Sequence, residues 1–266
     1  MRFETPPVVK NLILINIIFF IAQTFLPDGN GEKLTELLSL HYFGSSLFYP
    51  HQFITHMFLH ANFTHLFANM FALWMFGRIL EYDLGSKRFL TFYMVCGIGA
   101  GLLHSGVAAW EMAGMRDAVA AFMNTPTPEL LDSFVRDYFP NRSEAVDQFI
   151  LNWYNNPDNM GYAVEGKALV ARMETLKLDV PTVGASGAVF GVLLAFGMLH
   201  PNDRIMLLIP PIPLKAKYFV IAYGVLELFL GFAQSNSNVA HFAHVGGMLF
   251  GFILLYLWKK QGKIYY

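Results

Sequence analysis

A serine between small residues at the start of an apolar run is the first feature of this sequence that could do chemistry. Ser186 lies in the sequence GASG at residues 184–187, which opens an apolar run. Glycine exposes backbone N–H groups and lets another chain come close. His244 stands in the same way near the start of the last apolar run, in AHVGG at residues 243–247. We interpret Ser186 as a candidate nucleophile and His244 as a candidate base, each at the mouth of a membrane helix.

The serine and the histidine need each other for catalysis. A serine hydroxyl is a poor nucleophile until a base takes its proton, and neutral imidazole is the usual base near pH 7. His241 is a rival base, but we expect it to lie nearer the membrane surface than His244. No aspartate follows in the pattern to orient the imidazole, so the residues predict a serine–histidine dyad and an intramembrane serine protease.

Polar residues in a third apolar run have two interpretations. His65 and Asn69 are one helical turn apart and share a face. They could hydrogen-bond between helices, which is worth about 1 kcal/mol, or donate to a developing oxyanion. Taken alone, the pattern favours the first. His56, His60 and His65 together could also form a metal site, but no cysteine and no intramembrane carboxylate lies near them in the sequence, and there is no HExxH motif. We therefore expect no metal ion, and interfacial hydrogen bonding for His56 and His60.

Two glutamates lie in or at the end of apolar runs. Glu81 follows Arg78 at the end of the second run, where an interfacial ion pair or a hydrogen bond to a loop would explain it. Glu227 lies inside the fifth run, and a carboxylate in a span is usually functional or well satisfied. It could belong to the proton relay of a transporter, although the sequence indicates no partner for it.

The composition is that of a membrane protein. Only 14% of the 266 residues are charged and 55% are hydrophobic, whereas soluble domains are about 25% charged. The net charge of −1 gives no reason to expect a nucleic-acid partner. Cys96 is the single cysteine, so no disulfide can form within the chain, and we expect a buried thiol.

Six apolar runs are long enough to span or nearly span a bilayer, which takes about 20 residues. They cover residues 10–26, 57–80, 89–110, 184–200, 217–233 and 240–258. If the N-terminus is cytoplasmic, most Lys and Arg residues fall in cytoplasmic connections. The short outer connections then hold Lys33 alone, since residues 234–239 contain no Lys or Arg. This asymmetry, to which Arg2 contributes, predicts cytoplasmic termini and a site that opens to the outside.

Residues 111–180 differ from the runs around them. They carry 17 of the 37 charged residues, and three amphipathic helices are expected in them, each too polar to span a membrane. Thr127 should cap the first, with Pro128 at its first position, and Ser143 should cap the second. The sequence therefore predicts three parts: residues 1–110 with three spans, an extra-membrane insertion at 111–180, and residues 181–266 with three further spans.

The sequence as a whole closely resembles the rhomboid family of intramembrane serine proteases over about residues 35–110 and 180–258. The matching motifs are HANFTHLFAN at residues 60–69, Glu81 followed by LGS at 84–86, GASGAVFG at 184–191, and AHVGG at 243–247. The resemblance implies an all-α, polytopic bundle of six transmembrane helices. The insertion between the third and fourth spans has no counterpart in the minimal family core.

The resemblance also implies roles for particular residues. Ser186 is the nucleophile, His244 the general base, and His65, Asn69 and the Ser186 N–H surround the oxyanion. Substrates are single transmembrane segments cut near the outer face, and no metal or cofactor is needed. The partners would be such substrates and the lipid bilayer, in a bacterial inner (plasma) membrane, while the sequence leaves the oligomeric state open.

Two other functions remain open at this point. One is a proteolytically inactive rhomboid-like factor that binds membrane proteins, and the other is a transporter. The presence of both Ser186 and His244 argues against the first, and the scarcity of buried charge besides Glu227 argues against the second. The chain departs from the family pattern at His51-Gln52, where the outer loop usually carries Trp-Arg, which affects the seating of that loop and not the chemistry.

Overall fold

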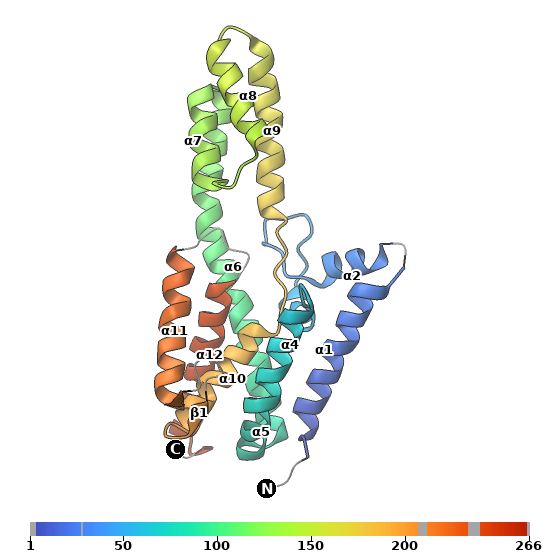
Figure 1. Cartoon of the computed structure of the whole chain (residues 1–266), viewed down its shortest axis with the longest axis vertical. Coiled ribbons are helices and arrows are strands. Elements are labelled where there is room, and N and C mark those ends of the chain that lie inside the picture. The colour runs from blue at the N-terminus through green and yellow to red at the C-terminus, as the bar shows by residue number, and fades with distance from the viewer. Residues whose placement is uncertain (1–3, 28, 207–211, 234–239, 265–266) are drawn as a thin grey trace. The chain divides into compact units, whose positions relative to one another are not determined.

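The computed structural model describes residues 4–27, 29–206, 212–233 and 240–264, and shows a mostly helical chain (Figure 1). Arg2 and the connection 234–239, which both enter the orientation argument, lie outside these residues. A short antiparallel pair of strands, with Arg204 opposite Lys215, was not predicted. The elements are α1 (Pro7–Phe25), α2 (Asn30–Leu38), α3 (Gln52–Thr55), η1 (His56–Phe58), α4 (Phe63–Ala72), η2 (Leu73–Gly77), α5 (Arg78–Leu84), α6 (Ser86–Asn124), α7 (Pro128–Tyr138), α8 (Glu144–Asn155), α9 (Met160–Leu178), α10 (Ser186–Leu199), β1 (Arg204–Met206), β2 (Pro213–Lys215), α11 (Ala216–Ala233) and α12 (His241–Lys260).

The chain divides into two compact units. The first, called the bundle here, comprises residues 1–40, 47–105 and 181–266, and the second, called the lobe, comprises residues 41–46 and 106–180. Helix α6 contributes to both, because it continues beyond the apolar run that we expected to end near residue 110. The alanine-rich sequence after that point favours helix, and the helix ends at Asn124, two residues before Pro126.

Helices of membrane-spanning length identify an integral membrane protein. Within the described residues, four helices (α1, α6, α11 and α12) are long and apolar enough to cross a bilayer. Their outer surfaces carry apolar side chains that a soluble protein would bury, such as Ile18 on α1 and Phe229 on α11, which are 54% and 64% exposed. Helix α10 has only 14 residues, which agrees with the short fourth apolar run of the sequence.

The second apolar run forms three helical segments in series. It begins at Phe63 and not near residue 57, because residues 56–58 form a separate 3₁₀ turn and Asn62 caps the helix. The Asn62 side chain accepts a hydrogen bond from the His65 N–H at 2.9 Å. Between α4 and α5 the π-helical turn η2 (Leu73–Gly77) interrupts the α-helical register.

Glu81 ties together the starts of two helices. Its carboxylate accepts hydrogen bonds from the N–H groups of Val8 and Val9, at 3.0 and 2.8 Å, in the first turn of α1. It also accepts one from the Ser86 hydroxyl, at 2.7 Å, at the start of α6. Negative charge is favourable at helix N-termini, where N–H groups lack partners. Glu81 is thus hydrogen-bonded, as one of the two alternatives expected, but its partners belong to helix starts and not to a loop. The Arg78 guanidinium lies 4.9 Å from the ring centre of Trp74.

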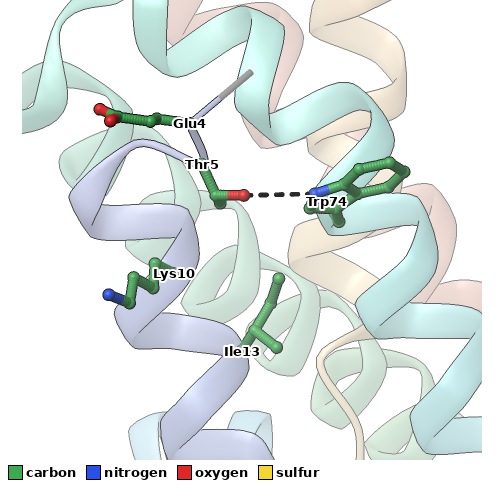
Figure 2. Close-up of a pocket in the computed structure, with 5 residues that line it drawn as sticks. All are labelled: Glu4, Thr5, Lys10, Ile13 and Trp74. Carbon is green, nitrogen blue, oxygen red and sulfur yellow. Dashed lines mark hydrogen bonds between the residues drawn. The ribbon is translucent and has the colours of Figure 1, made fainter. Parts of the chain in front are cut away.

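A hollow lies beside the N-terminal end of α1. Its lining residues are Glu4, Thr5, Lys10, Ile13 and Trp74 (Figure 2). The Trp74 indole N–H donates to the Thr5 hydroxyl at 3.3 Å. This hydrogen bond joins η2 to the segment before α1. None of the candidate catalytic residues lines this hollow.

Glycines bring the backbones of α10 and α12 together. A Cβ on Gly247 would fall against the carbonyl oxygen of Gly187, and one on Gly191 would fall against the Cys96 side chain and lie 3.0 Å from the Gly247 carbonyl oxygen. The two helices meet main chain to main chain at these points, as the small residues in both motifs predicted. Cys96 is fully buried, which agrees with the expected thiol in the core.

The lobe has an apolar core of its own, formed by α6, α7, α8 and α9. Thr127 caps α7 as predicted, since its hydroxyl accepts from the Leu130 N–H at 3.3 Å, whereas Ser143 precedes α8 without such a bond. Helix α9 begins at Met160, earlier than the expected start near residue 165. The buried core includes Met115, Phe122, Leu131, Phe134, Trp153 and Val170.

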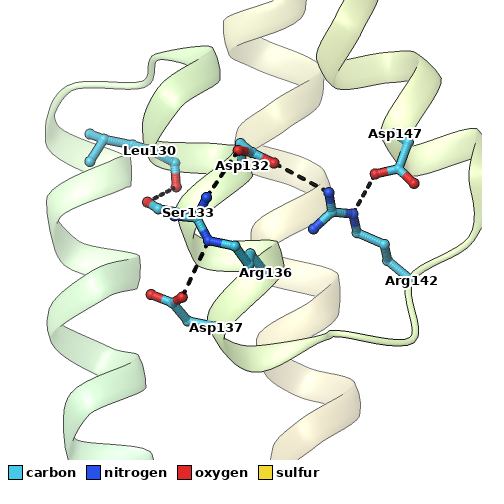
Figure 3. A network of polar contacts seen from close by, with 7 residues as sticks. All are labelled: Leu130, Asp132, Ser133, Arg136, Asp137, Arg142 and Asp147. Carbon is cyan, nitrogen blue, oxygen red and sulfur yellow. Dashed lines mark hydrogen bonds and ion pairs between the residues drawn. The ribbon is translucent and has the colours of Figure 1, made fainter.

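A charged network joins α7 to α8 in the lobe (Figure 3). Arg142, in the connection between the helices, forms an ion pair with Asp132 of α7 at 3.3 Å and another with Asp147 of α8. Asp132 also lies 3.5 Å from Arg136, one turn further along α7. Because these side chains are partly exposed, each pair contributes little alone, and the apolar core supplies most of the stability of the lobe.

Candidate active site

Ser186 is the first residue of α10. The N–H groups of the first helical turn, that of Ser186 included, have no partner within the helix and can bind a ligand. Gly184 precedes it with φ at +132°, a conformation that a residue with a side chain rarely adopts. The chain thus turns sharply into the helix and leaves the Ser186 side chain half-buried at its start.

Main-chain hydrogen bonds hold the segment before Ser186. The Gly184 N–H donates to the His56 carbonyl at 2.9 Å. Leu40 and Thr182 exchange two hydrogen bonds, of 2.9 and 2.8 Å, as an isolated β-bridge. The position of the serine is therefore set by contacts with the segments that precede α4.

His244 reaches Ser186 from the first turn of α12. Its Nε2 atom lies 2.9 Å from the Ser186 Oγ atom, a hydrogen-bond distance. The His244 ring is stacked on Phe190, one turn after the serine, with ring centres 4.1 Å apart and planes 6° from parallel. The two residues predicted as nucleophile and base are thus in direct contact, and an aromatic ring fixes the plane of the imidazole.

His65 lies beside the same turn. A Cβ placed on Gly184 would be 2.8 Å from His65 Cε1, 2.9 Å from His65 Nε2 and 3.5 Å from Ser186 Oγ. The imidazole therefore lies against the backbone that leads into Ser186. Asn69 is buried one turn further along α4, and its Nδ2 atom donates to the His65 carbonyl at 3.1 Å. One amide hydrogen of Asn69 is thus used within its own helix, and the second is available to another acceptor.

The two other histidines of this region behave differently from each other. His56 Nδ1 lies 2.7 Å from the Gln52 carbonyl oxygen, which agrees with the expected hydrogen bonding. His60 is only 2% exposed, and neither of its ring nitrogens has a hydrogen-bond partner among the described residues. The expectation of interfacial hydrogen bonding is wrong for His60, whose ring packs edge-on against His65 with ring centres 5.0 Å apart.

Glu227 has partners that the sequence did not indicate. Its Oε2 atom lies 2.8 Å from His244 Nδ1 and 2.7 Å from His241 Nδ1. All three side chains are buried. The rival base His241 therefore contacts the carboxylate and not the serine, while His244 contacts both. A signal was present in the spacing of the two histidines, since residues three apart share a helix face.

The same three residues are the group in the described part of the chain whose donor atoms could hold a metal ion. Their ligand atoms lie within 4.8 Å of one another. The candidate metal group considered from the sequence was a different one, around His56, His60 and His65. The separations of 2.7 and 2.8 Å within the Glu227 group are those of hydrogen bonds.

The comparison with protein families gives the class of the protein. A family model described as the rhomboid domain matches residues 48–130 and 159–261, which is more than half of the chain. The chain belongs to the rhomboid family, as its motifs predicted. Its helices of membrane-spanning length agree with the helical membrane bundle of that family.

Three relatives illustrate the similarity. Rhomboid protein 1, a mitochondrial protein of Saccharomyces cerevisiae, is 27% identical over 201 residues, 76% of this chain and 39% of the yeast protein. An uncharacterized mitochondrial rhomboid protein of Schizosaccharomyces pombe is 28% identical over 215 residues, 78% of this chain and 51% of its own length. YdcA of Bacillus subtilis, by its name a candidate rhomboid protease, is 27% identical over 206 residues, 77% of this chain and 65% of its own length.

These relatives do not support the predicted bacterial plasma membrane, because two of the three are mitochondrial. The chain spans between 39% and 65% of the length of the three proteins. The comparisons therefore establish the family, and the helices of membrane-spanning length establish an integral membrane protein.

Proposed function

We propose that the protein is an intramembrane serine endopeptidase that cuts transmembrane segments of other membrane proteins. The observation that carries this proposal is the 2.9 Å contact between Ser186 Oγ and His244 Nε2 at the start of a helix in an apolar bundle. A hydroxyl in such surroundings normally bonds to its own helix backbone. Here it faces an imidazole nitrogen instead, which is the arrangement that activates serine for attack on a carbonyl.

The chemistry follows from this pair. His244 Nε2 takes the proton of the Ser186 hydroxyl while Oγ bonds to the carbonyl carbon of the substrate, whose oxygen becomes negative. When the C–N bond breaks, the imidazolium returns the proton to the leaving amine. Water, deprotonated by the same imidazole, then hydrolyses the acyl-enzyme and regenerates the serine. These steps need no metal or cofactor.

The oxyanion would form near the start of α10. The Ser186 N–H is free at the helix N-terminus, whose partial positive charge favours an anion. The imidazole of His65 borders the same turn, and Asn69 has a second amide hydrogen to offer. We assign these three donors to the oxyanion, since preorganised donors usually lower the barrier of such a reaction more than any other single effect.

The proposed architecture has six spans in three parts. The first three spans belong to residues 1–110 and the last three to residues 181–266, with the second span formed by α4, η2 and α5 and the fourth by α10. The insertion at 111–180 lies outside the membrane on the side of the active site, where it restricts which substrates enter. Reporter fusions in the connections test this topology, and a cytoplasmic insertion would contradict it.

Labelling with a fluorophosphonate probe tests the function, because only an activated serine reacts. The purified protein should be labelled, and Ser186→Ala and His244→Ala should abolish both labelling and cleavage of a transmembrane reporter. Their losses should not add, because the pair acts as a unit. Ser105→Ala, which removes another buried serine of the bundle, is the matched control and should react normally.

The alternative functions predict other results. A proteolytically inactive relative that only binds membrane proteins would not be labelled and would retain a reporter without cutting it. A transporter would move a solute independently of Ser186. Cleavage by purified Ser186→Ala at the normal rate would overturn the proposal.

A further inference from the structure

We propose that Glu227 positions the catalytic imidazole, so that the site is a chain of Ser186, His244 and Glu227 with His241 holding the carboxylate from its other side. This inference rests on the proposed protease function and goes beyond the serine–histidine dyad that the sequence predicted. Glu227 touches His244 and not the reacting atoms, so it is a positioning residue. The contacts of 2.9, 2.8 and 2.7 Å join the four side chains in series.

The carboxylate selects the tautomer that a general base needs. An ionised carboxylate can only accept hydrogen bonds, so the 2.8 Å contact with Glu227 places a hydrogen on His244 Nδ1. In the neutral ring this leaves the lone pair on Nε2, which faces the Ser186 hydroxyl at 2.9 Å. The imidazolium that forms during attack is then next to a negative charge.

Three contacts from three directions fix the His244 ring. Glu227 holds Nδ1, Ser186 holds Nε2, and the ring of Phe190 lies parallel to the imidazole with centres 4.1 Å apart. A ring held in this way is already in its reactive orientation before the substrate binds. Such preorganisation lowers the free-energy barrier of the reaction.

The contact with His241 explains how the Glu227 carboxylate can be buried. The Glu227 and His241 side chains are 6% and 8% exposed, and an unpaired buried carboxylate would be costly. The second imidazole supplies a further N–H at 2.7 Å to the same oxygen that receives His244. It therefore gives the carboxylate a second hydrogen-bond partner and holds it toward His244, although it has no contact with Ser186.

A purely structural role predicts something different. If the group only tied α11 to α12, its loss would lower stability and leave the pH dependence of the reaction unchanged. Other titratable groups near enough to act electrostatically on His244 or Glu227 are His65 of α4, His104 of α6 and Tyr223 of α11. They remain in every variant below and contribute equally to each profile.

The first test replaces Glu227 by glutamine, which keeps the shape and the acceptor but removes the charge. We expect labelling of Ser186 by the fluorophosphonate probe to slow at least 10²-fold, toward the roughly 10⁴-fold loss that a corresponding acid-to-amide change causes in a soluble protease with a catalytic triad. Reporter cleavage should show a lower kcat with unchanged KM. The acid limb of the pH–rate profile should move to lower pH, because no anion then favours the imidazolium.

Glu81→Gln is the matched control. It removes the charge of another buried glutamate of the bundle, one that holds helix N-termini and not His244. It should lower the unfolding temperature without shifting the pH–rate profile. An equal profile shift in Glu81→Gln would show that any lost carboxylate has this effect and would overturn the proposal.

His241 provides a second test if Glu227→Gln does not fold. His241→Asn retains an N–H near the position of Nδ1 and should keep most of the labelling rate, whereas His241→Ala should slow it at least 10-fold. Equal rates in both variants would overturn the role of His241.

Further outcomes separate this inference from the proposed function. Absence of labelling in the wild-type protein would refute the protease itself. Normal labelling with an unshifted profile in Glu227→Gln would refute only the positioning role. A wild-type activity that is lost on treatment with a chelator and restored by added metal, with no metal bound by Glu227→Gln, would identify the group as a metal site and would also overturn the positioning role.

Discussion

Gly247→Ala should slow the enzyme by separating two helices. A Cβ at Gly247 would stand 2.6 Å from the Gly187 carbonyl carbon and nearer still to its oxygen. Both are backbone atoms, so no side chain can rotate away. Carbon atoms rest about 3.5–4.0 Å apart, and α10 and α12 must therefore move apart by roughly 1 Å at this point.

The expected loss follows from this displacement. Ser186 directly precedes Gly187, and His244 lies one turn before Gly247, so the shift is transmitted to the 2.9 Å contact between them. A contact near 4 Å is beyond the reach of about 2.6–3.2 Å for proton transfer. Misplacement by about 1 Å can cost 10² in rate, and overpacking should cost about 1–3 kcal/mol of stability.

The assay compares the second-order rate of fluorophosphonate labelling with the unfolding temperature. Gly224→Ala is the matched control, because its Cβ would lie 2.9 Å from the end of the flexible Met248 side chain, which can move. Gly106→Ala adds a methyl group where, apart from its own stretch of helix, no atom of the described residues lies within 4 Å. Labelling of Gly247→Ala at the wild-type rate would refute the reasoning, and an equal loss in Gly224→Ala would show that the effect is not specific to the catalytic contact.

Three further predictions concern the oxyanion donors, the helix starts and the insertion. Asn69→Ala should reduce kcat for reporter cleavage, but by less than the roughly 10²–10³-fold lost on removal of a single oxyanion donor from a soluble protease, because other donors share the task here. A wild-type rate in both Asn69→Ala and His65→Ala would show that the two residues serve only in helix packing. Glu81→Gln should lower stability by about 1–3 kcal/mol in chemical unfolding, and an unchanged transition would contradict its role in joining the starts of α1 and α6. Deletion of residues 115–178 with a short linker should preserve labelling of Ser186 but change relative cleavage among substrates, whereas a monodisperse deletion protein without labelling would show that the insertion helps to build the site.

The sequence could nominate Ser186, His244, His65 and Asn69 because each lies in a short motif, although Ser186 and His244 are 58 residues apart. The small residues on either side of Ser186 are recognised within four positions of the sequence. The shared helix face of His65 and Asn69 is recognised from their spacing of four residues. The partners of Glu227 could not be read in this way. It lies on another helix, 14 and 17 residues before its two histidines, and whether they meet depends on the rotation of α11 and α12 about their axes.

Element boundaries were also only partly predictable. The cap at Thr127 and the proline after it defined the start of α7, since both act through local backbone chemistry. The length of α6 was missed because hydropathy falls after residue 110 while helix propensity does not. The π-helical turn η2 depends on how the second run packs, and nothing in its composition marks it.

The hydrogen bonds before Ser186 also bear on how this protein can evolve. Leu40, Thr182, His56 and Gly184 hold the nucleophile through main-chain groups, which every residue except proline provides in full. Substitutions at Leu40 and Thr182 that suit a different lipid or substrate therefore leave these main-chain groups in place. A site anchored by backbone in this way lets selection change what enters it without rebuilding the chemistry.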